Sequence, residues 1–169
     1  VVKDLVAYAR SIEKEHGKNF RFTLTTNGML VDDEVIDFAN KEMDNVVLSL
    51  DGRKEINDHF RKTVGGVGSY DIIVPKFQKL VTARGGKNYY MRGTFTHRNP
   101  DFTKDIQTML DLGFDELSME PVVCPPTDKY ALTEDDKQIV FKEYEKLADM
   151  MIERRKQSKP FTFYHYMLN

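Results

Sequence analysis

The strongest constraint on the fold is a repeated order of β-strand followed by α-helix. Strands joined through helices run parallel, so their carboxyl ends meet at one rim of the sheet. Each predicted strand ends in polar residues, and this rim is where ligands bind in parallel sheets. We therefore predict an α/β chain that includes a ligand-binding rim. The four predicted strands are Phe20–Thr26, Val46–Leu50, Tyr89–Thr96 and Glu116–Glu120.

Length and charge narrow the class of protein. The 169 residues suffice for one domain with a core, and 40% hydrophobic with 31% charged residues is ordinary for a globular protein. The net charge of −2 gives no reason to expect nucleic acid. Because no apolar run approaches the roughly 20 residues needed to cross a bilayer, we expect no membrane partner and a cytoplasmic location. The single cysteine, Cys124, excludes an internal disulfide, and we expect a packed, unreactive thiol.

Both ends of the sequence suggest a longer protein. Val1–Val6 enters a helical pattern at once, without a start methionine or a capping residue, and the aromatic stretch 161–169 stops inside an element. We interpret both ends as cuts. The missing parts of its own chain are then expected partners, and exposed strand edges favour self-association.

Four helices are predicted between the strands and after them. Asp32 caps the first, and Thr133 with Asp136 forms a capping box for a long helix that ends near Lys156. Pro75 should kink or shorten the helix that begins near Tyr70. Another helix opens at Asn99-Pro100 and closes at Gly113.

Several rim residues are candidates for ligand contacts. Thr26 and Asn27 end one strand in a tight turn, although Asn-Gly is common in turns generally. If Leu48 and Leu50 face the helices, alternation turns Ser49 to the opposite side. Asp51 suits a turn cap as well as a ligand contact. Arg61 could bind a carboxylate in a bidentate manner or lie in solvent.

A glycine-rich stretch at residues 65–68 precedes one predicted helix. It resembles a phosphate cradle, but it lacks the Lys-Ser/Thr ending of the nucleotide P-loop. We regard it as weak evidence for an anion site.

The order of these short motifs resembles the middle of radical S-adenosylmethionine (radical SAM) enzymes of the SPASM-domain group. The closing stretches 118–126 and 160–166 are similar to maturases that form thioether cross-links in six-cysteine ribosomal peptides. The matching segments, in order, are Thr26-Asn27-Gly28, Ser49-Leu50-Asp51-Gly52, Asp58-His59-x-Arg61, Gly65-x-x-Gly68-Ser69-Tyr70 and Arg92-Gly93-Thr94-Phe95-Thr96.

The resemblance implies part of a parallel β/α barrel of the TIM type, here with about four strands and flanking helices. Such a barrel binds S-adenosylmethionine against a 4Fe-4S cluster, and the resulting 5′-deoxyadenosyl radical takes hydrogen from a precursor peptide. The implied cofactor-binding residues are Ser49, Arg61, Thr26, Asn27 and Asp51. Thr94, Thr96 and Glu120 lie where substrate contacts are common in the family.

The sequence also departs from the family pattern. The CxxxCxxC loop that holds the cluster and the cysteines of the SPASM region are missing, so the cluster ligands would lie outside this chain. Residues 1–169 then represent the middle and C-terminal part of a core barrel, inactive alone, whose parent oxidoreductase modifies a peptide. Alternatives are another SPASM maturase, such as an anaerobic sulfatase maturase, or a non-catalytic nucleotide- or peptide-binding module.

Overall fold

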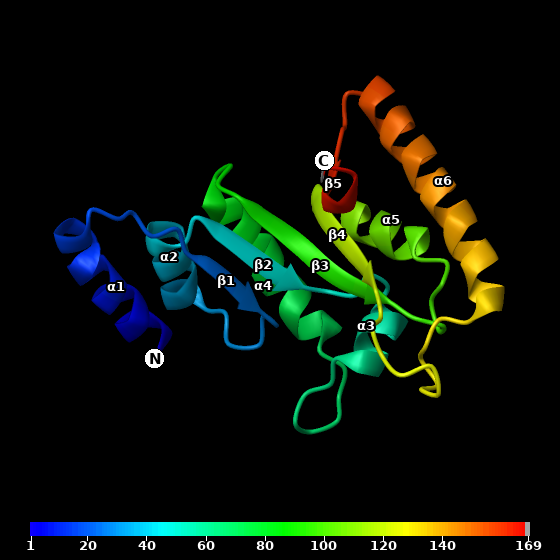
Figure 1. The fold of residues 1–169 in the computed structure, drawn as a ribbon, viewed down its shortest axis with the longest axis horizontal. Coiled ribbons are helices and arrows are strands. Elements are labelled where there is room, and N and C mark those ends of the chain that lie inside the picture. Colours follow the sequence, from blue (N-terminus) through cyan, green and yellow to red (C-terminus); the bar gives the residue numbers. More distant parts are fainter. Residues whose placement is uncertain (168–169) are drawn as a thin grey trace.

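The computed structural model describes residues 1–167 and has five parallel strands in one sheet. The strands lie side by side in chain order, as Figure 1 shows. They are β1 (Thr23–Thr26), β2 (Asn45–Ser49), β3 (Tyr89–Phe95), β4 (Glu116–Pro121) and β5 (Thr162–Phe163). The helices are α1 (Val2–His16), α2 (Asp33–Glu42), α3 (Lys54–Phe60), α4 (Tyr70–Arg84), α5 (Thr103–Asp111) and α6 (Glu134–Lys156), followed by the 3-10 helix η1 (Tyr164–Tyr166). The predicted α/β class and parallel order are confirmed.

The sheet differs from the prediction at its two ends. β5 was not predicted, because two residues are too few to show an alternating pattern. It pairs with Glu116 and Leu117, so β4 is covered there and is not a free edge along its whole length. β1 begins only at Thr23. The amide of Phe22 does not pair with a strand, because it donates a hydrogen bond to the Asp44 carboxylate in the turn before β2, at 2.9 Å.

The helix boundaries follow local capping chemistry. Asp32 accepts a hydrogen bond from the amide of Val35 at 2.9 Å, and Thr133 with Asp136 completes the predicted capping box of α6. α4 continues through Pro75 to Arg84, so the expected shortening is wrong. Pro75 lies in the second turn, where its missing N–H costs only one hydrogen bond. The short helix α3 was not predicted.

The two faces of the sheet differ in chemistry. Side chains that face the helices are fully buried, and Leu48, Met91 and Leu117 share one register row there. The opposite face, which we call the inner face, carries the next row, Ser49, Arg92 and Ser118. The alternation expected for Ser49 is therefore present: Leu48 and Leu50 are buried, and Ser49 is half-buried.

Within residues 1–167, no helix is both long enough and apolar enough to cross a membrane.

Candidate functional site

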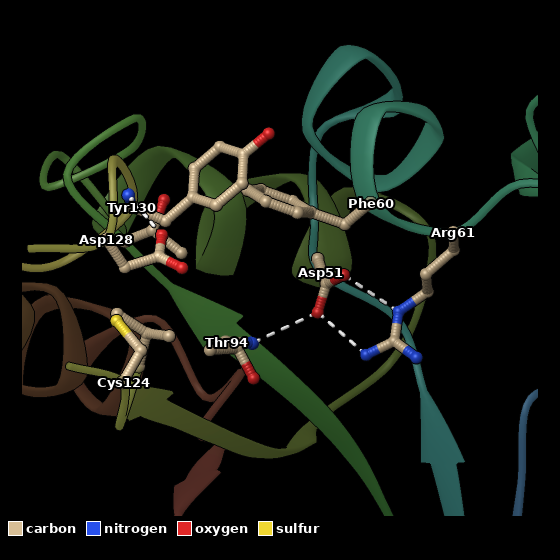
Figure 2. Close-up of a pocket in the computed structure, with 9 residues that line it drawn as sticks. Asp51, Phe60, Arg61, Thr94, Cys124, Asp128 and Tyr130 are labelled. Atoms are coloured by element: carbon tan, nitrogen blue, oxygen red, sulfur yellow. Dashed lines mark hydrogen bonds and ion pairs between the residues drawn. The ribbon is translucent and has the colours of Figure 1, made fainter.

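A cavity of about 370 Å³ lies at the carboxyl ends of β2, β3 and β4. It is the rim that the strand order predicted for ligands. Segments far apart in the sequence build it, as Figure 2 shows. Its lining residues are Asp51, Phe60, Arg61, Thr94, Thr96, Val122, Cys124, Asp128 and Tyr130.

Asp51 and Arg61 form a bidentate ion pair in the wall of this cavity (Figure 2). Arg61 Nε donates to Asp51 Oδ2 at 2.7 Å, and Arg61 Nη2 donates to Oδ1 at 2.9 Å. The amide of Thr94 donates to the same carboxylate at 3.1 Å, so the pair connects the ends of β2 and β3. Two of the three Arg61 guanidinium nitrogens are therefore engaged, and Nη1 forms no hydrogen bond within residues 1–167.

A second arginine, Arg53, lies outside the cavity lining and binds two aspartates next to the rim. Arg53 Nε donates to Asp105 Oδ1 at 2.7 Å, and Arg53 Nη2 donates to Asp101 Oδ1 at 2.7 Å. The side chain of Asp105 is fully buried, and burial raises the pKa of this carboxyl. Gly52 is needed here, because its φ is +97° and a Cβ would lie 2.2 Å from the Asp105 Cβ.

This network reaches the end of β3 through an amide side chain. Asn99 Nδ2 donates to Asp105 Oδ2 at 3.0 Å, and Asn99 Oδ1 accepts from both the amide and the hydroxyl of Thr96. Thr96 was predicted to contact substrate, and it does line the cavity. However, its hydroxyl already donates to Asn99, and the residue is only 3% exposed. Thr96 is therefore placed to stabilise the rim.

Glu120 lies on the inner face, beside the cavity and not in its lining. Arg92 Nη2 donates to Glu120 Oε2 at 2.6 Å, and Nε donates to Oε1 at 3.1 Å. These hydrogen bonds lower the pKa of Glu120. Because Glu120 registers with Thr94, two of the three predicted substrate residues lie in one row.

Aromatic residues form one wall of the cavity. The Phe60 and Tyr130 rings pack edge to face with centroids 4.9 Å apart, and both are labelled in Figure 2. The Tyr130 hydroxyl lies 2.7 Å from His59 Nε2. The backbone carbonyl of Tyr130 accepts a hydrogen bond from the amide of His97. These contacts fix the loop between β4 and α6 over the rim.

Thr26 and Asn27 lie outside this cavity. The Thr26 hydroxyl accepts from the amide of Gly28 at 3.1 Å, and Asn27 Oδ1 accepts from the amide of Met29 at 3.2 Å. Both side chains therefore stabilise their own turn. Residues 65–68 likewise form the tip of a small hairpin, in which Lys62 bridges to Gly68, and not a cradle at a helix start.

Cys124 is half-buried on the cavity wall, opposite the aromatic pair in Figure 2. Among residues 1–167, no three histidine, cysteine, aspartate or glutamate side chains are grouped as a metal site requires. The described residues therefore do not fit an iron-sulfur cluster.

We expected Cys124 to help shape the cavity, but the sequence prediction missed Asp128 and Tyr130 from the same loop, residues 122–133. Cys124, Asp128 and Tyr130 line the cavity because this loop folds back over the rim. The only available signal was position, since the loop directly follows the carboxyl end of a strand.

No protein-family model matches this sequence, and no curated protein sequence is similar to it. Solved structures do share its fold. The structure of anSMEcpe with bound AdoMet matches with a TM-score of 0.81 at 19% identity, over 96% of this chain and 46% of that chain. The structure of Streptococcus suis SuiB bound to precursor peptide SuiA matches with a TM-score of 0.61 at 16% identity, over 90% of this chain and 33% of that chain.

A third neighbour is a domain of pyruvate-formate lyase-activating enzyme from Bacteroides vulgatus, with a TM-score of 0.54 at 14% identity over 84% of this chain and 86% of that chain. All three neighbours are radical SAM proteins. This chain therefore shares the fold of part of the barrel in these neighbours, with five parallel strands and flanking helices. The chain spans less than half of the anSMEcpe and SuiB chains.

Proposed function

We propose that residues 1–169 are the middle and C-terminal part of the core barrel of a radical SAM enzyme that modifies a ribosomally made peptide. The observation that carries this proposal is the cavity at the carboxyl rim with the Asp51–Arg61 ion pair in its wall, built on a fold shared with structures that hold AdoMet or a peptide. The CxxxCxxC loop and the SPASM region would belong to other parts of the protein.

The residues at the rim suit S-adenosylmethionine, which when bound at a reduced 4Fe-4S cluster supplies a 5′-deoxyadenosyl radical. Its methionine part carries a carboxylate, and Arg61 Nη1 remains available to donate to one. Asp51 orients this guanidinium through two hydrogen bonds. Ser49 presents a half-buried hydroxyl on the inner face two residues earlier, where it could hold a ribose or an amino-acid group.

The cavity side of the rim suits the substrate. Thr94 lies in the wall of a space that Phe60, Val122 and Tyr130 make partly apolar. We assign Ser49 and Arg61 to the cofactor and the part of the cavity under the loop at residues 122–133 to the substrate. We assign the substrate as a precursor peptide and the modification as thioether cross-linking at cysteines.

The direct test is the activity of the full-length protein that contains this chain. After anaerobic reconstitution of its cluster and chemical reduction, it should release 5′-deoxyadenosine from S-adenosylmethionine. Mass spectrometry of a cysteine-rich precursor peptide should then show a loss of two hydrogens per thioether. A protein that forms no 5′-deoxyadenosine with a fully loaded cluster would refute the assignment.

Two alternatives remain open to the same assay. The highest TM-score given above is to anSMEcpe, an anaerobic sulfatase maturase, which favours a maturase that oxidises a peptide residue without cross-linking. Such an enzyme would give the same 5′-deoxyadenosine but a different peptide product. A non-catalytic nucleotide- or peptide-binding module would bind its ligand without iron.

A further inference from the structure

Three exposed cationic side chains lie around the mouth of the rim cavity. Each lies within two positions of a residue that lines the cavity, and each belongs to a different loop: Lys62, Arg98 and Lys129. The ion pairs described at this rim are made by other residues: Arg53 binds Asp105, Arg61 binds Asp51 and His97 binds Asp136. We call the three exposed cations the basic mouth.

The positive charges of all three cations act on His59, whose Nε2 lies 2.7 Å from the Tyr130 hydroxyl. Burial lowers the pKa of His59, and the positive charges of Arg98, Lys62 and Lys129 lower it further. Lys129 Nζ lies 4.9 Å from the centre of the Tyr130 ring. Because that ring lines the cavity, the Lys129 ammonium lies next to the cavity wall.

The acidic groups of this region are largely engaged. Asp51 binds Arg61, and Asp136 binds His97 at 2.7 Å while it caps α6. Asp128 is the acidic residue of the cavity wall that forms no ion pair within residues 1–167, and its Oδ1 accepts from the amide of Tyr130 at 2.8 Å. The mouth is therefore positive on a chain whose net charge is −2.

We propose that the basic mouth binds acidic residues of a peptide whose target side chain enters the cavity. Complementary charge at a rim steers binding and fixes register. A peptide suits the site better than a nucleic acid, because the cations flank a cavity of about 370 Å³ that Phe60, Val122 and Tyr130 make partly apolar, and the net charge of −2 gives no general attraction for a polyanion. The inference rests on the proposed function only in treating the bound peptide as substrate, since binding itself needs no reaction.

The test is fluorescence anisotropy with the full-length protein and three labelled peptides. Each peptide carries a central cysteine, flanked on both sides by glutamates, by glutamines or by lysines. At low salt the glutamate peptide should bind about tenfold more tightly than the glutamine peptide, and salt should reduce this difference. Equal affinity for these two peptides would overturn the proposal.

A matched pair of triple variants locates the effect. The variant Lys62→Gln, Arg98→Gln, Lys129→Gln should lose the preference for glutamate. The control Lys18→Gln, Lys142→Gln, Arg155→Gln removes the same charges from exposed positions outside the cavity lining and should keep it. An equal loss in both variants, or tighter binding of a single-stranded oligonucleotide than of the glutamate peptide, would overturn the assignment.

Formation of 5′-deoxyadenosine, measured separately, keeps the two proposals apart. Glutamate-dependent peptide binding without cofactor cleavage would support the basic mouth and refute the radical SAM function. Cofactor cleavage without any charge preference in peptide binding would support the function and refute the basic mouth.

Discussion

Arg53 and Arg61 lie eight positions apart in the sequence and both bind carboxylates at the same rim, but they differ in what they leave available. Arg53 uses all three guanidinium nitrogens on Asp101 and Asp105, behind the cavity. Arg61 uses two on Asp51 and lines the cavity itself. A bidentate ion pair alone therefore does not tell whether an arginine has a structural or a ligand-binding role. The two roles are distinguished by whether a guanidinium nitrogen remains without a partner and by whether the side chain lines the cavity.

The largest expected effect is loss of stability in Arg53→Met. The change leaves the fully buried Asp105 carboxylate without its cation, and breaking such a pair costs about 3 kcal/mol or more. Chemical denaturation would measure the change in the free energy of unfolding. Arg21→Met, at an exposed pair 4.0 Å apart, is the matched control and should change stability by less than about 0.5 kcal/mol. Equal effects in both variants would remove the structural distinction.

Arg61→Ala should weaken cofactor binding and also lower stability, because it leaves the buried Asp51 carboxylate without its cation. In the full-length, cluster-loaded protein, calorimetry should show a loss of roughly 1.5–3 kcal/mol in S-adenosylmethionine binding, against about 1 kcal/mol for Ser49→Ala. Arg61→Lys should recover only part, because a point charge cannot bind Asp51 in a bidentate manner and also reach a ligand. Unchanged affinity in Arg61→Ala would mean that Arg61, like Arg53, only supports the rim.

Glu120→Gln tests the inner face beside the cavity. It weakens an ion pair with Arg92 that is partly exposed, so stability should fall by less than about 1 kcal/mol. Uncoupled cleavage of S-adenosylmethionine should stay nearly intact, and peptide modification should decrease. Quantifying 5′-deoxyadenosine and modified peptide in one reaction separates the two. Equal losses would place Glu120 with the cofactor.

The smallest effect concerns His59 and pH. Its pKa in the folded chain lies below its ordinary value of 6.5, so the unfolded chain binds more protons between these two values. The free energy of unfolding should therefore be highest above pH 6.5 and fall as the pH drops toward the folded pKa. His59→Gln should lose this dependence while Arg53 and its pairs stay intact. A pH profile identical to that of the wild type would show that the protonation of His59 does not contribute to the pH dependence of stability.

Much of the fold could be predicted because its signals are local. Asp32 and the pair Thr133 with Asp136 cap helices through hydrogen bonds made within a few residues. Strand alternation correctly separated Leu48 from Ser49. Pro75 misled the prediction because its cost depends on where in the helix it lies, and β5 was missed because its two residues are ordered by pairing with β4.

The candidate site was only partly accessible from the sequence. The strand-then-helix order by itself determined a parallel sheet with a polar rim, and it placed Asp51, Arg61, Thr94 and Thr96 there. Tertiary structure alone decided that Asp51 holds Arg61, that Thr96 is engaged by Asn99, and that Thr26 and Asn27 lie apart. It also brought Tyr130 to His59 across 71 positions. The physical reason is range: alternation and capping act between neighbours in the chain, whereas ion pairs and cavity walls join groups that meet only after the sheet has formed.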